Sequence, residues 1–363
     1  MSDALSRLPE DFDRGRFSRR QLLKGLGAVA LAPAASAFAI PAAQAGAPAA
    51  QTSAPVAAPF EPTGWKTVLL DHFSCKVADY EKEAAFYNAL MNWGVRSSDA
   101  QKTVLDIGDF GGIVIQGGYQ PSAEALAAEK AQYDRRAAAA SRRGTTPGPF
   151  VPRATVFDGF CWGIDQWDAK KVEAALKARG LDPVADNQGH DFQSFHVKDP
   201  DGFDVQISNG NRSNRRTKPA SGHLSAAAPF DHTDWKTVWI DHISYQCSDY
   251  KKTVAFYQAL LGWQPTADTG RENQVRIGDV GDIIIRSHFG GAGGASIDHI
   301  AVGITPFNPE EVKAALDKRG LRSSIDTNGG GAIDTAPYKS YHTQTPNGFD
   351  LQISNVTIAT RGL

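Results

Sequence analysis

The stretch Ala58-Pro-Phe-Glu-Pro-Thr-Gly-Trp65-Lys-Thr-Val-Leu-Leu-Asp-His72 decides the fold, because it returns 170 residues later as Ala228-Pro-Phe-Asp-His-Thr-Asp-Trp235-Lys-Thr-Val-Trp-Ile-Asp-His242. From Trp65 to Gly117 the first copy aligns with the second without a gap, with 22 identities in 53 positions. Both halves also end alike, in Pro-Asp-Gly-Phe-Asp-Val-Gln-Ile-Ser-Asn at 200–209 and Pro-Asn-Gly-Phe-Asp-Leu-Gln-Ile-Ser-Asn at 346–355. A repeat of this length predicts two homologous domains in one chain.

Each half begins with a strand followed by a helix. Residues 68–77 and 238–247 alternate apolar and polar side chains and are rich in β-formers, which is typical of half-buried strands. Asp79 and Asp249 then stand where a helix N-cap belongs, ahead of apolar stripes at helical spacing. Further β-rich runs separated by glycine turns follow, including a hairpin over 103–116.

The second part of each half repeats this pattern. Helices are predicted near 168–178 and 309–319, closed by Gly180 and Gly320 at the position after the last helical residue. The fold class is therefore α+β, with tandem βαβββ modules, four in the chain. The predicted boundaries are an export signal at 1–45, an Ala/Pro tether at 46–57, a first domain at 58–209 with an insertion at 119–153, a linker at 210–227, and a second domain at 228–357.

The first 45 residues have the features of an export signal. Paired Arg19 and Arg20 precede a modest apolar stretch and the small-residue motif Ala43-Gln-Ala45, which is the twin-arginine form of a bacterial signal peptide. The stretch is too short and too rich in small residues and proline for a good membrane span. We therefore expect recognition by the twin-arginine translocation machinery, a periplasmic or secreted product, and no stable membrane span after cleavage.

Composition removes two classes of function. The 363 residues carry 38 Lys and Arg against 40 Asp and Glu, a net charge of −2, so the basic field that a non-specific nucleic-acid binder needs is missing. Three cysteines and no Cys-x-x-Cys pair predict neither a disulfide framework nor a structural zinc site.

The insertion at 119–153 breaks the symmetry between the halves. It contains an Ala/Glu/Arg-rich helix former, Glu124 to Arg143, where the second half has only a short Gly-rich connection. The composition favours a solvated surface helix over a lid or a dimer contact.

Taken together, an Asp-His strand, a helix with a Phe-Tyr pair about 14 residues later, and an Asp-Pro-Asp-Gly turn before the last strand resemble the vicinal oxygen chelate superfamily. That superfamily includes glyoxalase I, extradiol dioxygenases, and bleomycin and fosfomycin resistance proteins. The resemblance covers about 58–356, and four modules in one chain look most like the extradiol dioxygenases. It implies that each pair of modules curls an eight-stranded sheet into a half-open barrel around a metal.

The resemblance also implies the metal ligands, which fall on the first strand of each module and near the end of the last strand. In the second domain these positions are His242, His299 and Gln352, where the family usually has glutamate at the third. Two imidazoles and one carboxylate suit Fe(II) or Mn(II), with Zn(II) or Ni(II) as further candidates, and Gln352 keeps an oxygen donor but removes the negative charge. Asp350 lies two residues before Gln352, on the same strand face, and could supply the missing charge.

A further histidine of the second domain is a candidate acid or base. His342 lies on the penultimate strand and is assigned a catalytic role together with Asp350. The alternative is a core imidazole satisfied by the backbone, since His196 recurs at the same place in the first domain.

The first domain offers a poorer site. His72 and Gln206 stand at ligand positions, but Gly159 replaces the second histidine and Gln116 is only a further amide. We therefore interpret this domain as a structural or substrate-shaping partner. Cys161 lies on the same strand face as Gly159, and its reactivity depends on exposure.

The sequence favours an exported, metal-dependent enzyme that chelates a small substrate through vicinal oxygens, most like a ring-cleaving dioxygenase. One alternative is a glyoxalase-like lyase or isomerase, a group that tolerates a glutamine ligand. The other is a metal-free ligand-binding protein resembling the bleomycin resistance group, which the replacements at Gly159, Gln206 and Gln352 favour.

Overall fold

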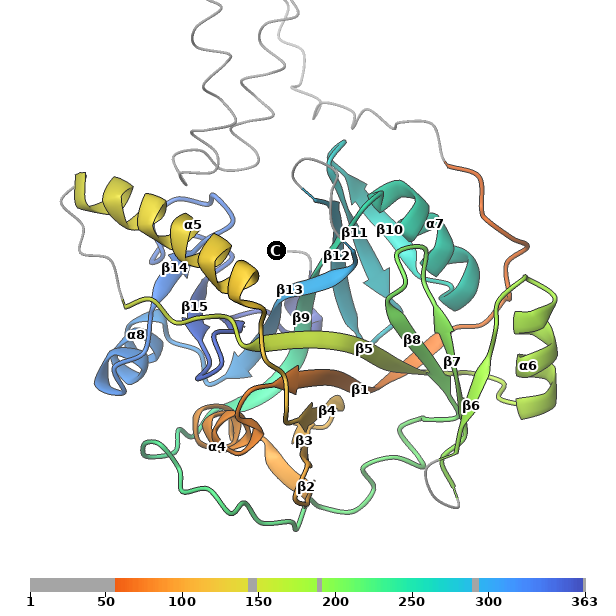
Figure 1. Ribbon diagram of the computed structural model, residues 1–363, viewed down its shortest axis with the longest axis horizontal. Coiled ribbons are helices and arrows are strands. Elements are labelled where there is room, and N and C mark those ends of the chain that lie inside the picture. Colours follow the sequence, from red (N-terminus) through yellow and green to blue (C-terminus); the bar gives the residue numbers. More distant parts are fainter. Residues whose placement is uncertain (1–55, 143–148, 188–190, 289–293, 362–363) are drawn as a thin grey trace, which may run out of the picture.

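The structure is a computed structural model that describes residues 56–142, 149–187, 191–288 and 294–361 (Figure 1). The predicted signal at 1–45 and most of the tether lie outside the described residues. The elements of the first half are β1 (Thr67–Val77), α4 (Tyr80–Met91), β2 (Gly94–Ser98), β3 (Lys102–Ile107), β4 (Gly111–Gln116), α5 (Ala123–Arg142), β5 (Thr155–Ile164), α6 (Ala169–Lys177), β6 (Val184–Asp186), β7 (Ser194–Lys198) and β8 (Asp204–Ser208).

The second half repeats this order without a counterpart of α5. Its elements are β9 (Lys236–Cys247), α7 (Tyr250–Leu261), β10 (Gln264–Asp268), β11 (Glu272–Ile277), β12 (Gly281–Ser287), β13 (Ser296–Thr305), α8 (Pro309–Lys318), β14 (Ser324–Asp326), β15 (Ser340–Gln344), β16 (Asp350–Ser354) and a short 3₁₀ helix (Ile358–Thr360). The predicted α+β class and the four βαβββ modules are confirmed.

Each half forms one open eight-stranded sheet. The strand orders are β2-β3-β4-β1-β5-β8-β7-β6 and β10-β11-β12-β9-β13-β16-β15-β14, so the two sheets have the same topology. In each sheet the first strands of the two modules pair antiparallel at the centre, and the last strand of each module runs parallel beside a first strand. This arrangement brings the predicted ligand positions to the middle of the sheet.

The local signals of the sequence act as expected at the helix ends. The side chain of Asp79 accepts from the backbone N–H of Lys82, and Asp249 caps α7 in the same way. Gly180 and Gly320 follow α6 and α8 with φ of 73° and 68°, a conformation that favours glycine. Within the part of the chain that the structure describes, no helix is both long and apolar enough to cross a bilayer.

The opening segments of the repeat, 58–66 and 228–236, each bind the helix of the other half. Thr63 donates from its backbone N–H to the Ala259 carbonyl (2.9 Å) and from Oγ1 to the Leu260 carbonyl (2.8 Å) at the end of α7. Thr233 makes the same two contacts with α4, at 3.0 and 2.6 Å. These carbonyls have no partner within their own helix, so each half completes the helix of the other.

One arginine ties each opening segment to its own half. Arg179, just after α6, donates to the carbonyls of Glu61 (2.7 Å) and Pro62 (2.8 Å). Arg319 holds the second segment in the same way, through the Asp231 carbonyl. Because each segment is bound by both halves, it acts as a bridge between them.

The turns before β8 and β16 each contact the other half, and each of these two contacts includes one buried acid. Asp199 accepts hydrogen bonds from the hydroxyls of Tyr245 (2.5 Å) and Tyr257 (3.2 Å) in the second half. At the matching interface the acid comes instead from a helix, where Glu83 accepts from the side-chain amide of Asn347 (2.8 Å). Each interface therefore buries a single carboxyl, contributed from opposite sides.

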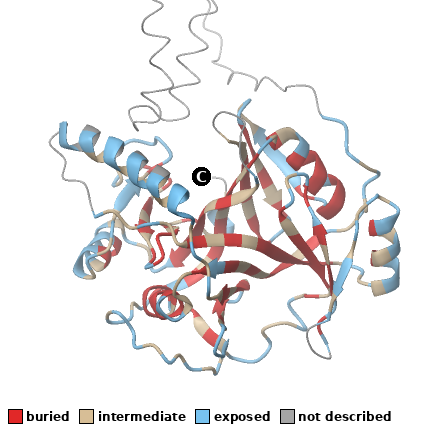
Figure 2. Cartoon of the chain, viewed as in Figure 1, coloured by how far each residue is buried: buried red, intermediate tan, exposed pale blue. Residues whose placement is uncertain are grey.

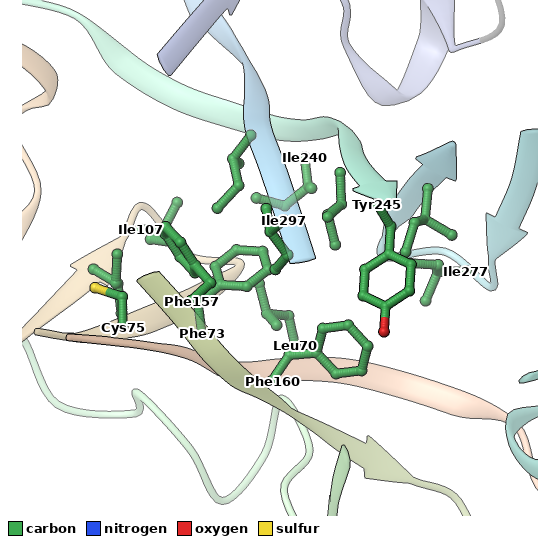
Figure 3. Close-up of a cluster of buried hydrophobic side chains, with 14 of the residues drawn as sticks. Leu70, Phe73, Cys75, Ile107, Phe157, Phe160, Ile240, Tyr245, Ile277 and Ile297 are labelled. Carbon is green, nitrogen blue, oxygen red and sulfur yellow. The ribbon is translucent and has the colours of Figure 1, made fainter. Parts of the chain in front are cut away.

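One continuous hydrophobic core joins the two sheets. Figure 3 shows Phe73, Phe157 and Phe160 of the first half meeting Ile240 and Tyr245 of the second. Buried residues follow the strands of both sheets and the inner faces of α4 and α7 (Figure 2). Removing this apolar surface from water stabilises the pair of halves as one unit.

Glycine in the β11–β12 turn allows one of the close approaches between the halves. At Gly278, φ is 45° and an added Cβ would lie 2.7 Å from the Thr67 carbonyl oxygen of the first half. We expect Gly278→Ala to lower the free energy of unfolding by about 1–3 kcal/mol more than Gly270→Ala. Gly270 also has positive φ (83°) but nothing within 4 Å, so it carries the conformational penalty without the clash. Denaturant unfolding measures both, and equal losses would contradict the close contact.

The two interfacial acids predict a pH dependence of stability. Burial raises the pKa of Glu83 above 4.5 and of Asp199 above 3.8, against opposing hydrogen bonds. Between the unfolded and the folded pKa values, the two carboxyls are protonated in the folded state and ionised in the unfolded state. The stability that these two carboxyls contribute is therefore complete below the unfolded pKa values and is lost as the pH rises through the folded pKa values.

Unfolding free energies measured from acidic to neutral pH test this. The combined variant Glu83→Gln and Asp199→Asn should lose part of that slope, whereas Glu124→Gln on exposed α5 should keep it. A slope unchanged in the interfacial variant would show that neither carboxyl holds its proton in the folded state.

Candidate metal centre

His242 and His299 converge at the centre of the second sheet. They lie on the neighbouring antiparallel strands β9 and β13, and their Nε2 atoms are 3.1 Å apart. Both rings are largely buried, with side-chain exposures of 13% and 11%. The two imidazoles that the sequence assigned to one site are therefore brought together.

An acidic neighbour holds the other nitrogen of each ring. His242 Nδ1 lies 3.3 Å from Asp241 Oδ1, and His299 Nδ1 lies 3.1 Å from Asp298 Oδ2. A proton on Nδ1 that donates to the carboxylate leaves Nε2 with a bare lone pair. Burial, together with the nearby His242, lowers the pKa of His299 to about 4 despite Asp298, so this ring is neutral at neutral pH.

The facing nitrogens fit a shared cation. Two lone pairs 3.1 Å apart repel each other unless a proton or a positive ion lies between them. Metal–imidazole bonds of about 2.1 Å let one ion contact two nitrogens at this separation. The pair therefore has the geometry that a divalent metal requires, and His299 is neutral, as a metal ligand must be.

Gln352 lies on the same face and presents an unused oxygen. In register, His242 is opposite Ala301, and Ala301 is opposite Gln352, so the three form one row across β9, β13 and β16. The Gln352 amide nitrogen donates to Tyr338 Oη (2.9 Å) and Ser340 Oγ (2.7 Å). Its Oε1 is buried and has no hydrogen-bond partner among the described residues, which fits a metal ligand.

His342 extends this row and is held as a cation. It lies opposite Gln352 on β15, and its ring centroid is 5.3 Å from that of His299. Burial lowers its pKa, but Asp326 and Asp350 outweigh this effect and raise the pKa of His342 to about 9. At neutral pH this residue is therefore a proton donor, and the predicted role as an acid fits better than the role as a base.

Asp350 is engaged by other groups. Its Oδ1 accepts from His342 Nδ1 (3.1 Å) and from Arg322 Nη2 (2.9 Å). Among the described residues, the ligand atoms of Asp350, His242 and His299 do not all lie within 4.8 Å of one another. Asp350 therefore holds the charge of His342 and does not stand at a ligand position.

The first half keeps the surroundings of the site but not its centre. His196 contacts Asp204 (2.5 Å), and Gln206 donates to Ser194 (2.8 Å), which repeats the His342, Asp350, Gln352 and Ser340 arrangement. Gly159 replaces His299, as the sequence predicted, and leaves His72 without its partner imidazole.

One group of potential ligands does occur in the first half. Oxygen, nitrogen and sulfur atoms of Asp71, His72 and Cys161 lie within 4.8 Å of one another. Arg215 binds the Asp71 carboxylate (2.7 Å), and burial raises the pKa of the Cys161 thiol well above its ordinary value. The acid is already paired and the thiol stays protonated, so this group is a poor metal site and Cys161 is unreactive.

A residue of the insertion reaches the second-half site, which the sequence did not indicate. Arg153 donates from Nη2 to the Ile297 carbonyl (2.6 Å), and its Nη1 lies 3.9 Å from Asp298, which orients His299. Glu129 of α5 accepts from the backbone N–H of Arg153 at 3.0 Å. The predicted surface helix is present and largely exposed (Figure 2), and Arg153 lies beside the site.

Comparison with known proteins agrees with this architecture. Residues 239–319 match the family model of the Glyoxalase/Bleomycin resistance protein/Dioxygenase superfamily. No curated protein matches the chain in sequence. The resemblance that the motifs suggested therefore holds for this segment of the second half.

Solved structures share the fold across most of the chain. The Mn(II)-bound glyoxalase from Novosphingobium aromaticivorans is 15% identical, with a TM-score of 0.53 over 82% of this chain and 86% of that chain. The 2,3-dioxygenase from Pseudomonas sp. KL28 is 14% identical, with a TM-score of 0.52 over 80% and 92%. Homoprotocatechuate 2,3-dioxygenase from Arthrobacter globiformis is 15% identical, with a TM-score of 0.51 over 83% of each chain. The chain thus shares its fold with these three solved structures.

The acid behind His299 offers a test of the site that leaves the imidazoles in place. We expect Asp298→Asn to weaken Mn(II) binding about 10–100-fold, because the ring loses the partner that fixes its tautomer. Asp158→Asn changes the matching acid before Gly159 and should leave the affinity unchanged. Calorimetric titration with Mn(II) measures both, and equal affinities in the two variants would refute the orienting role of Asp298.

Proposed function

We propose that this protein is a divalent-metal-dependent enzyme that binds a small substrate through vicinal oxygens, with ring cleavage by dioxygen as its reaction. The observation that carries the proposal is the pair of facing Nε2 atoms of His242 and His299, each backed by a carboxylate. Two of the structurally similar proteins are 2,3-dioxygenases and one is a Mn(II)-bound glyoxalase, which supports this class of chemistry.

His242, His299 and Gln352 Oε1 would hold the ion, with Fe(II) or Mn(II) as the favoured species. The bound ion would act as a Lewis acid and bring two substrate oxygens and dioxygen together. An amide in place of a carboxylate removes one negative charge from the ligand set. The ion would therefore be bound more weakly and would attract substrate oxygens more strongly. The Gln352 amide nitrogen remains fixed by Tyr338 and Ser340, which orients its oxygen.

His342 would supply the proton that the reaction needs. Its imidazolium is stabilised by Asp350 and Asp326 and lies beside His299. Arg322 fixes Asp350 from the other side (2.9 Å) and so keeps the acid pair in place. The role of these residues is to position one proton next to the substrate while the surrounding sheet limits access of water.

A glyoxalase-like lyase or isomerase is the second candidate. Gln352 favours this candidate, because the glyoxalase-like group that the motifs resemble accepts glutamine as a ligand. The Mn(II)-bound glyoxalase among the similar structures supports the same reading. Dioxygen uptake with a panel of catechols separates the two, since only ring cleavage consumes dioxygen.

Metal content of the purified protein tests the site. We expect about one equivalent of divalent metal per chain, and loss of both metal and activity in the double variant His242→Ala and His299→Ala, since each ligand contributes directly to affinity. His72→Ala removes the matching histidine of the first half and should keep both. Elemental analysis and an oxygen electrode provide the measurements.

Two outcomes would overturn the proposal. One is purified protein that neither contains nor takes up Fe, Mn, Zn or Ni. The other is metal binding that survives the double variant unchanged. Tight binding of a small ligand by protein stripped of metal would instead support the third reading, a ligand-binding protein without a metal.

We also propose export by the twin-arginine route, on the basis of Arg19, Arg20 and the Ala43-Gln-Ala45 motif. In a bacterial host, the full chain should appear in the periplasmic or secreted fraction with the signal removed. Arg19→Lys with Arg20→Lys should retain it in the cytoplasm. Equal export of the variant would contradict the assignment.

A further inference from the structure

The concave face of the first sheet contains a cavity of about 740 Å³. Residues from β1, β3, β4, β5, β7 and β8 form its wall, and the linker residues 214–218 close one side. This linker, expected only to connect the domains, instead packs into the first half: Arg215 binds Asp71 (2.7 Å), and Arg216 donates to the Asp71 carbonyl. The volume is in the range of small-molecule sites.

The lining of this cavity is rich in cations. Seven lysines and arginines and five aspartates line it, an excess of two positive charges with the histidines neutral. Among the described residues, neither Lys102 nor Lys218 has a carboxylate within 4.0 Å of its ammonium group, and Lys102 interacts with Asp99 only at longer range. The whole chain, by contrast, has a net charge of −2. The excess of positive charge is therefore local to this concavity.

Comparison of the two halves shows that their basic residues stand at different positions of the shared sheet. Two positions are basic only in the second half, where Arg276 and Arg286 replace Asp106 and Gln116. Four sheet positions that are basic in the first half are neutral or acidic at the same place in the second. The pairs are Lys76 and Gln246, Arg96 and Thr266, Lys102 and Glu272, and Lys198 and Gln344. All four basic residues line the cavity. The same scaffold folds with either set, so folding does not require the positive charges.

Only part of this charge is neutralised by the protein. Lys76 pairs with Asp158 (3.2 Å) and Lys198 with Asp204 (2.9 Å), both with the lysine side chain about half exposed or more. Such exposed pairs contribute little and exchange readily for another anion. Positive groups on several sides of a walled cavity attract small anions and raise their local concentration.

We propose that the cavity of the first half binds a small organic polyanion with carboxylate or phosphate groups. Lys76, Lys102 and Lys198 on the sheet and Lys218 on the linker would contact the negative groups. Arginines fixed by Asp71 and Asp106 would orient them. The site is distinct from the metal centre of the second half and does not depend on it.

Titration calorimetry at low salt tests this with metal-stripped full chain. Tricarballylate probes carboxylates and pyrophosphate probes phosphates, with neutral glycerol as the control. We expect binding of at least one anion that weakens as salt is raised. In the variant Lys76→Gln, Lys102→Gln and Lys198→Gln the dissociation constant should rise about tenfold or more.

The matched control is Lys170→Gln, Lys171→Gln and Lys177→Gln, which removes the same charge from the exposed face of α6. It should leave the affinity near that of the unchanged protein. Equal weakening in both triple variants would show that the affinity depends only on the net charge of the protein, and would overturn the proposal. The absence of binding by both anions would also overturn it.

The His242→Ala and His299→Ala variant separates this proposal from the proposed function. Anion binding should persist there, because the cavity contains neither residue. Loss of anion binding in that variant would place the site in the second half and refute the assignment to the first.

Discussion

The structure depends on the reciprocal exchange of opening segments between the halves. Thr63 binds carbonyls at the end of α7 and Thr233 binds carbonyls at the end of α4, so each helix has hydrogen-bond donors for its last turn in the other half. The exchange holds the two sheets around one shared core, in which Phe157 and Phe349 pack with centroids 4.5 Å apart and ring planes tilted by 41°. The two halves therefore hold each other in place through contacts in both directions. The central strands, on which the polar sites lie, are positioned by residues of both halves.

On this shared frame the two concave faces have diverged. Both keep the same polar arrangement on the outer strands, seen as His196 with Asp204 and His342 with Asp350. The second half alone adds the facing imidazoles, whereas the first half has Gly159 there and gathers cations instead. Duplication supplied one scaffold twice, and the difference between the halves lies in side chains and in the inserted segments, not in the topology.

The sequence predicted what depends on local pattern and on the repeat. The four modules and the caps at Asp79 and Asp249 followed from pattern and spacing, and the pairing of His242 with His299 followed from the family resemblance. It could not predict contacts between distant segments. The placement of Arg153 beside Asp298, 145 residues later, leaves no periodic signal. The protonated state of His342 also depends on burial and on acids from other strands, which a single sequence does not reveal.

The proposed metal centre lies in the second half, where the two Nε2 atoms of His242 and His299 face each other. An anomalous-difference map from crystals grown with Mn(II) tests this most directly. A single strong peak is expected between the Nε2 atoms of His242 and His299, within bonding distance of Gln352 Oε1. A peak at Asp71, His72 and Cys161, or no peak in the second sheet, would contradict it.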